Sequence, residues 1–276
     1  MNTLISISTL SEAPAVSSPP PVRRLLNALW RWPGKEATLL FTGLLLAWQL
    51  GAAFFTTAAN PLLPTPWRVA QALWDSLPEL WIGTWSSFLI LIPGYLAAVV
   101  FGVVAGLLVA TTPGLRRAFF PLARVVAPVP PTVYIPYAIA LLPTFLLSAM
   151  FVVFIGAFWP VFQNAAAGAL AVEARYRDNA RVLGLTHREY LCKVVFPASL
   201  PHIFSGMAVG LAFAFILLTV AELFGANAGL GRFVQYYADF ADYPRMVAGI
   251  LYTGLITFLA LSLLEQLRKR ALFWLK

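Results

Sequence analysis

Three stretches of the sequence contain no charged residue and are long enough to cross a lipid bilayer as helices. They comprise residues 80–115, 125–172 and 246–264, and each exceeds the roughly 18 apolar residues that a transmembrane helix needs. The second stretch has room for two crossings. Because the apolar runs are continuous and do not alternate with a period of two, they predict helices and not the strands of a barrel. The sequence therefore indicates an all-α membrane protein with several spans.

The composition agrees with this interpretation. Hydrophobic residues make up 60% of the 276 residues and the mean hydropathy is +0.80, which is too apolar for a soluble domain. With two more apolar segments, the predicted spans are about six, at residues 38–55, 82–109, 125–142, 145–170, 203–224 and 246–264. Residues 37–276 then form one transmembrane domain. Residues 1–36, rich in Ser and Pro, are predicted to be a disordered cytoplasmic tail.

The net charge of +8 follows the predicted topology. Sixteen of the 19 Lys and Arg residues lie before or after alternate spans, and the other loops carry only Arg68, Arg232 and Arg245. The positive-inside rule then places both termini in the cytoplasm. The basic residues are thus explained without a nucleic-acid partner, and we expect none.

The sequence contains no cluster of residues that would bind a metal or perform covalent catalysis. Cys192 is the only cysteine, and His187 and His202 are the only histidines, with no ligand cluster at suitable spacing. We therefore predict no metal site, no catalytic residue and no enzymatic activity.

Residues 121–143 contain six prolines, which forbid one regular helix. Broken backbone is tolerated in a bilayer where it is buried in protein or lines a wet cavity. The predicted third span, with Tyr134 and Tyr137, is either part of a solute pathway or a proline-kinked packing helix.

Three polar side chains lie inside predicted spans and are further pathway candidates. A carboxylate such as Glu222 is costly in a bilayer and is usually paired or functional. It lines a pathway or its gate, or it lies near the outer interface, where it bonds a neighbouring helix or holds the turn at Gly225. Gln163 and Asn164 contact either a solute or another span.

Residues 173–201 form a polar segment between two apolar blocks. A helix is predicted from Asp178, and Gly184 can adopt the left-handed conformation that ends it. Thr186 and Glu189 match a capping box for a second helix, which Pro197 and the proline at 201 are expected to end. This helix–break–helix segment outside the bilayer is either a docking site for another protein or a solvated connection.

The spacing in this segment resembles the E-A-A-x3-G-x9-I-x-L-P loop of ABC importer permeases. Gly184 and Pro197 match that pattern, whereas Asn179 and Phe196 depart from it. In that family the loop forms coupling helices that sit in a groove of the ATPase subunit, so that ATP-driven closure reaches the spans. The resemblance implies an ATPase-coupling role for the following residues: Asp178, Ala180, Gly184, Thr186, Glu189 and Pro197.

Four further stretches resemble the nitrate/sulfonate/taurine-type permeases and occur in that branch's order. They read "LPTPWRVAQALW", "PVPPTVYIP", "GAFWPVFQNAAAG" and "AELFGANAGLG", and the resemblance extends from residue 63 to the C-terminus. The W-F-G of many members is replaced by "LLPTFLL". The resemblance implies the type I ABC importer permease fold in a bacterial inner membrane.

The resemblance also implies a function. The chain is expected to be the permease subunit of an ATP-driven, binding-protein-dependent importer, for a small anion or small organic solute of the sulfonate, nitrate or bicarbonate type. It has no G-x-x-x-x-G-K-[S/T] loop, so ATP and Mg are expected on a partner ATPase, with no cofactor in this chain. The implied partners are an ATPase dimer, an extracytoplasmic binding protein, a second permease copy and membrane lipid. The alternative is an ion-coupled secondary transporter, for which Glu222 alone is thin support.

Overall fold

The computed structural model describes residues 35–55 and 62–275. Every regular element in these two ranges is a helix, which confirms the predicted all-α fold. The chain divides into one unit that ends at Phe55 and another that begins at Thr56. The tail predicted at residues 1–36 lies outside the described residues, except for the first two residues of helix α2.

The first unit contributes helix α2 (Lys35–Phe55). Its side chains are mostly apolar and exposed, and Leu39, Leu40, Phe41 and Leu44 each expose more than 60% of their surface. An apolar helix with exposed side chains all round suits a lipid environment.

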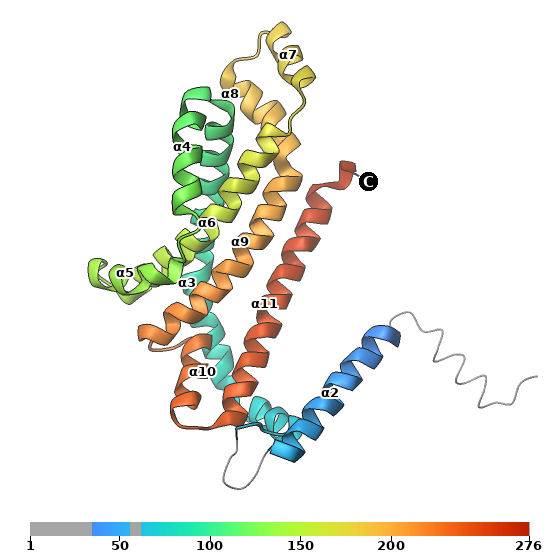
Figure 1. Cartoon of the computed structure of the whole chain (residues 1–276), viewed down its shortest axis with the longest axis vertical. Helices are drawn as coiled ribbons and strands as arrows, with labels where there is room; N and C mark the ends of the chain where they lie inside the picture. The colour runs from blue at the N-terminus through green and yellow to red at the C-terminus, as the bar shows by residue number, and fades with distance from the viewer. Residues whose placement is uncertain (1–34, 56–61, 276) are drawn as a thin grey trace, which may run out of the picture. The chain divides into compact units, whose positions relative to one another are not determined.

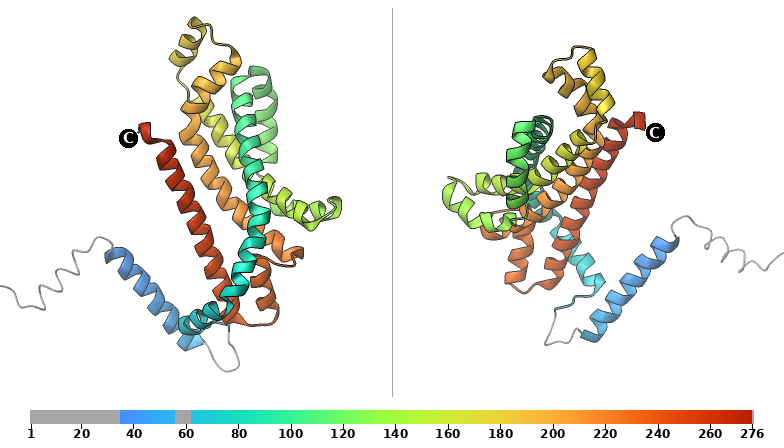
Figure 2. Two further views of the ribbon diagram at one scale, coloured as in Figure 1. Left: turned by 180° about the vertical axis from the view of Figure 1, so that it is seen from behind. Right: turned by 45° about the horizontal axis from the view of Figure 1, so that its top comes forward.

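The second unit is built on four long helices: α3 (Pro66–Thr111), α6 (Phe145–Leu170), α9 (Phe196–Gly225) and α11 (Tyr243–Ala271). They run along the long axis of this unit, as Figures 1 and 2 show. Each is long and apolar enough to cross a membrane, α9 as part of a continuous helix from His187 to Gly225. A bent pair of shorter helices provides a fifth possible crossing among the described residues.

Helix α3 begins sixteen residues before the span predicted at 82–109. The Thr65 hydroxyl accepts a hydrogen bond from the backbone N–H of Arg68, and Pro66 occupies the first turn. We predicted a span that begins at residue 82, whereas the structure has one helix of 46 residues that begins at Pro66. Pro78 removes only one helical hydrogen bond, and Leu80 packs with Leu230 and other apolar side chains beyond it, so the helix continues.

Glycines bring α3, α6 and α9 into close contact. A Cβ atom at Gly102 would lie 2.9 Å from Val161 Cγ1, and one at Gly106 would lie 2.7 Å from the carbonyl oxygen of Phe162. On the neighbouring helix, a Cβ atom at Gly206 would lie 2.6 Å from Asn164 Cβ. Helix α6 therefore packs closely against both α3 and α9, with glycines at each contact.

The proline-rich region forms two limbs and not one helix. Helix α4 (Pro113–Val126) is followed by the short 3-10 helix η1 (Pro131–Tyr134) and α5 (Ile135–Leu141), with a bend of 85° between the limbs. The first limb begins twelve residues before the start of the span that we predicted at 125–142. Pro128 and Pro130 lie in the break, where a missing N–H interrupts no helix.

Candidate functional site

The polar segment of the sequence forms a pair of short helices at one end of the bundle (Figure 1, top). Helix α7 (Ala174–Val182) is followed by α8 (His187–Tyr190). A π-helical stretch, η2 (Leu191–Val195), joins α8 to α9. We call residues 174–190 the α7–α8 hairpin.

The break inside the hairpin has the predicted local chemistry. Gly184 has a φ of +67°, the left-handed conformation that favours glycine. The N–H of Gly184 donates to the carbonyl of Arg181, and the N–H of Leu185 donates to the carbonyl of Ala180. These bonds satisfy carbonyls at the end of α7 that have no partner within the helix.

The capping box predicted at the start of α8 is also present. The N–H of Glu189 donates to Thr186 Oγ1 over 3.3 Å, and the N–H of Thr186 donates to Glu189 Oε2 over 3.0 Å. Lys193 Nζ lies 2.9 Å from Glu189 Oε1. Both ends of the break are therefore fixed by short-range hydrogen bonds.

The end of the second helix was predicted wrongly. Pro197 and Pro201 do not stop it, because the helix continues through η2 into α9. Pro197 lies in the first turn of α9, directly after the π-helical stretch, where the hydrogen-bond pattern already changes register. Pro201 removes one helical bond in a helix that is packed on α6, where Ser199 and His202 lie against Gly168.

The tip of the hairpin exposes apolar side chains. Val182 is 86% exposed and Leu183 is 74% exposed, whereas Ala180 is buried. Asp178 and Arg181 flank them, with 3.8 Å between carboxylate and guanidinium. Two exposed aliphatic side chains inside a charged border are typical of a docking surface.

A second polar cluster lies at the other end of α9, around Glu222. Ser87 Oγ of α3 donates to Glu222 Oε1 over 2.6 Å, and the N–H of Gly231 donates to Glu222 Oε2 over 2.6 Å. Ser87 Oγ also accepts from the N–H of Leu230 over 3.0 Å. Glu222 and Ser87 are fully buried. These four residues, the Glu222 cluster, join α3, α9 and the start of α10 (Leu230–Asp239).

Two glycines make room for the carboxylate. Gly229 has a φ of +148°, and a Cβ atom there would lie 2.5 Å from Glu222 Cδ. A Cβ atom at Gly231 would lie 2.5 Å from the carbonyl oxygen of Thr219. The G-x-G spacing therefore allows the backbone N–H groups at the start of α10 to reach Glu222 and Ser87.

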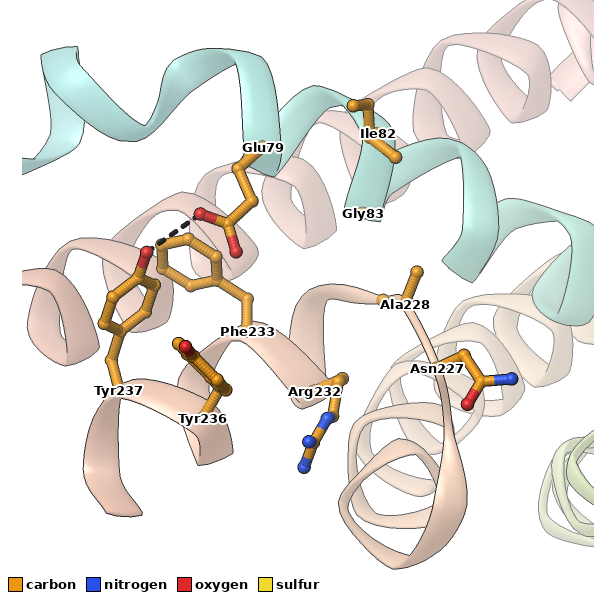
Figure 3. Close-up of a pocket in the computed structure, with 10 residues that line it drawn as sticks. Glu79, Ile82, Gly83, Asn227, Ala228, Arg232, Phe233, Tyr236 and Tyr237 are labelled. Atoms are coloured by element: carbon orange, nitrogen blue, oxygen red, sulfur yellow. Dashed lines mark hydrogen bonds between the residues drawn. The ribbon is translucent and has the colours of Figure 1, made fainter. Parts of the chain in front are cut away.

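Next to the Glu222 cluster is an open pocket of about 520 Å³ between α3 and α10. The Tyr237 hydroxyl donates to Glu79 Oε2 over 2.9 Å, and Figure 3 shows the two side chains facing each other. Arg232 and Asn227 also line the pocket, and the Arg232 guanidinium carbon lies 6.0 Å from the centroid of the Tyr236 ring. Partial burial and the Glu79 carboxylate raise the pKa of the Tyr237 hydroxyl above its usual value.

The predicted pathway residues Asn164 and Glu222 lie in different parts of the bundle. Asn164 donates to the carbonyl of Pro160 and packs on Gly206, sixteen residues before Glu222, which is about 24 Å along a helix. Gln163, next to Asn164 on α6, is exposed. Tyr134 and Tyr137 lie on the bent pair, and Tyr137 is 67% exposed.

The hydrogen-bond partners of Glu222 were not predicted from the sequence. Ser87 lies 135 residues earlier in the chain and Gly231 contributes only its backbone. The one available signal was Ser86 and Ser87 within a charge-free span, since buried hydroxyls need hydrogen-bond partners.

Together these features define a membrane protein with several spans, which has the buried Glu222 cluster at one end of its bundle and the exposed α7–α8 hairpin at the other. Residues 98–272 match the family described as the inner membrane component of binding-protein-dependent transport systems, and the chain belongs to this family. This family is a transport permease family and not a catalytic one.

Similar proteins agree with the family. The nitrate import permease protein NrtB of Synechocystis sp. is 28% identical over 78% of this chain and 81% of its own length. The taurine transport system permease protein TauC of Escherichia coli is 30% identical over 89% of this chain and 93% of its own. A crystal structure of an amino acid ABC transporter with histidines has the same fold, with a TM-score of 0.54 and 17% identity over 72% of this chain and 97% of that one. The resemblance to ABC importer permeases of the nitrate/sulfonate/taurine type is thus confirmed.

Proposed function

We propose that this chain forms the substrate pathway of an ATP-driven importer and couples to a separate ATPase through residues 178–197. The observation that carries the proposal is the exposed apolar tip of the α7–α8 hairpin, Val182 and Leu183. Burial of two aliphatic side chains in a groove of a partner supplies several kcal/mol, about 1.5–3 kcal/mol for each.

The hairpin is also built to transmit motion. Helices α8, η2 and α9 form one continuous helix of 39 residues, about 58 Å long, from His187 to Gly225. The docking surface is at one end of this helix and Glu222 is at the other. A displacement of α8 by a partner would therefore move the helix that holds the Glu222 cluster. The hydrogen bonds around Gly184 and Thr186 keep the hairpin stiff enough to pass on such a push.

We infer the partners from the same arrangement and from the family. ATP and Mg would be bound by a cytoplasmic ATPase dimer, and solute would be delivered by an extracytoplasmic binding protein. Two permease copies, most simply a homodimer, would enclose the pathway in a bacterial inner membrane. The positive-inside rule favours a cytoplasmic α7–α8 hairpin, with the pocket beside Arg232 on the outer side.

The substrate is proposed to be a small anion or a small organic solute. NrtB is named for nitrate and TauC for taurine. The open pocket near the Glu222 cluster presents the guanidinium of Arg232 and the amide of Asn227, groups that attract an anion. An ion-coupled secondary transporter is less well supported, because both oxygens of Glu222 accept hydrogen bonds from within the chain.

Affinity purification of the tagged chain from a mild detergent, followed by mass spectrometry, tests the proposal. We expect a P-loop ATPase in an equimolar ratio, and a binding protein encoded nearby would then be screened for sulfonates, nitrate and bicarbonate. A chain that emerges alone, under conditions in which a known importer keeps its ATPase, would contradict the coupling role.

A further inference from the structure

The first limb of the bent pair, α4, is exposed on most of its circumference. Among its residues only Ala123 is buried, and Phe120 and Val126 are half-buried. A groove of about 460 Å³ runs along it and reaches the end of α6. Its lining combines three arginines with apolar side chains: Arg116, Arg117, Phe120, Pro121, Arg124 and Leu170.

The three arginines lie on one side of the helix. At 100° per residue, Arg116, Arg117 and Arg124 fall within about 100° of the circumference. The next part of the surface is apolar and exposed, with Leu122 at 53% and Val125 at 73%. Helix α4 is therefore amphipathic, with a basic stripe beside an apolar one.

The arginines of α4 have no ion-pair partner in the described part of the chain. Helix α4 has no acidic residue. Acidic residues near the α7–α8 hairpin and on α11 have basic partners of their own, as in the pairs Glu173–Arg175 and Glu265–Arg268. Three uncompensated guanidinium groups on one groove attract a phosphate or another oxyanion.

The apolar stripe decides which oxyanion fits. A free inorganic ion would leave Leu122 and Val125 uncovered. A second copy of the chain docked symmetrically on this face would bring like charges together, which is unfavourable. A phospholipid satisfies both stripes, because its phosphate meets the arginines while its acyl chains cover the aliphatic side chains.

We propose that the α4 groove binds the headgroup of an anionic phospholipid through Arg116, Arg117 and Arg124. The lipid headgroup would lie against the arginines of the first limb of the bent pair. This site does not depend on the proposed coupling to an ATPase, and it is tested with the permease alone.

The experiment is native mass spectrometry of the full-length chain in mild detergent containing equal amounts of phosphatidylglycerol and phosphatidylcholine with identical acyl chains. We expect the wild-type chain to retain phosphatidylglycerol in preference to phosphatidylcholine. The triple variant Arg116→Gln/Arg117→Gln/Arg124→Gln should weaken this binding about a hundredfold, since each basic residue near an anionic lipid contributes about fivefold.

Two matched variants keep the test sharp. Arg268→Gln/Lys269→Gln/Arg270→Gln removes the same charge from the end of α11 and should keep the preference. Arg116→Lys/Arg117→Lys/Arg124→Lys keeps the charge and should retain most of the binding. The proposal fails if the α4 Gln variant binds phosphatidylglycerol like the wild type, or if both Gln variants lose it equally. It also fails if sulfate displaces the lipid at a constant ionic strength, or if the α4 Gln variant changes only the oligomeric mass.

Discussion

The two ends of the continuous helix from His187 to Gly225 differ in which groups they bury. At the Glu222 end, a carboxylate and a hydroxyl are fully buried, and backbone N–H groups of α10 complete their hydrogen bonds. At the α7–α8 end, the polar groups are bonded locally, and the aliphatic side chains of Val182 and Leu183 are left in the open.

This difference separates a part that is complete within the chain from a part that is not. Burying a carboxylate costs several kcal/mol unless its oxygens are bonded, and the Glu222 cluster meets that requirement without help. Exposed aliphatic side chains at the tip of a stiff hairpin gain most from a partner. We therefore expect mutations at the Glu222 end to affect the stability of the chain and mutations at the hairpin to affect assembly.

The largest effect should come from placing charges on the hairpin tip. The double variant Val182→Asp/Leu183→Asp should weaken ATPase binding by about a thousandfold, because central interface residues often contribute about 2 kcal/mol each. Binding is measured by titrating the purified ATPase onto the chain in detergent. Phe273→Asp, a substitution at an exposed residue after α11, is the control and should bind normally. Equal binding by the double variant would remove the tip from the interface.

The next largest effect concerns the space around Glu222. Gly229→Ala would force a Cβ atom to within 2.5 Å of the carboxylate carbon at a φ of +148°. We expect a loss of about 3 kcal/mol, seen as a lower Tm of the purified chain. Gly254→Ala lies inside α11 with nothing within 4 Å of the new Cβ atom, so it should not lower the Tm. If the two variants have the same Tm, the close packing at Gly229 does not stabilise the chain.

Removing one hydroxyl from the same cluster should have a smaller effect. Ser87→Ala deprives both Glu222 Oε1 and the N–H of Leu230 of a partner. The expected cost is about 2 kcal/mol, again read from the Tm. The adjacent Ser86→Ala loses an exposed bond to the carbonyl of Ala228 and should cost less than about 0.5 kcal/mol. A larger loss for Ser86 than for Ser87 would contradict the importance of the buried cluster.

The smallest effect is expected at the break of the hairpin. Gly184→Ala meets no neighbour within 4 Å, so only the φ of +67° opposes it, at about 1 kcal/mol. Hydrogen exchange of the amides in α7 should accelerate about fivefold. Gly114→Ala is also in open space but has no positive φ, and it should leave the exchange of α4 unchanged. If Gly184→Ala leaves the exchange of α7 as unchanged as Gly114→Ala leaves that of α4, the left-handed turn does not stabilise the hairpin.

The sequence predicted best what depends on neighbouring residues. The capping box of Thr186 and Glu189 and the turn at Gly184 are set by local chemistry. Such features need only a few residues to recognise.

Features that depend on packing between distant residues were predicted less well from the sequence. Pro197 and Pro201 were expected to end a helix, yet the helix continues through them into α9, which packs on α6. The partner of Glu222 is Ser87, 135 residues away, and no spacing rule connects the two. From the sequence, Glu222 can line a pathway or form structural hydrogen bonds. A carboxylate inside a span indicates that a partner exists but does not show which residue it is.

The most direct test of the account is site-specific photo-cross-linking at the two ends of the bundle in native membranes. A photoreactive residue is placed at Leu183 in the hairpin or at Phe240, which is 69% exposed at the end of α10. We expect an adduct with a P-loop ATPase from position 183 and none from position 240. An ATPase adduct from position 240 alone, or no ATPase adduct from position 183 when the importer is intact, would contradict it.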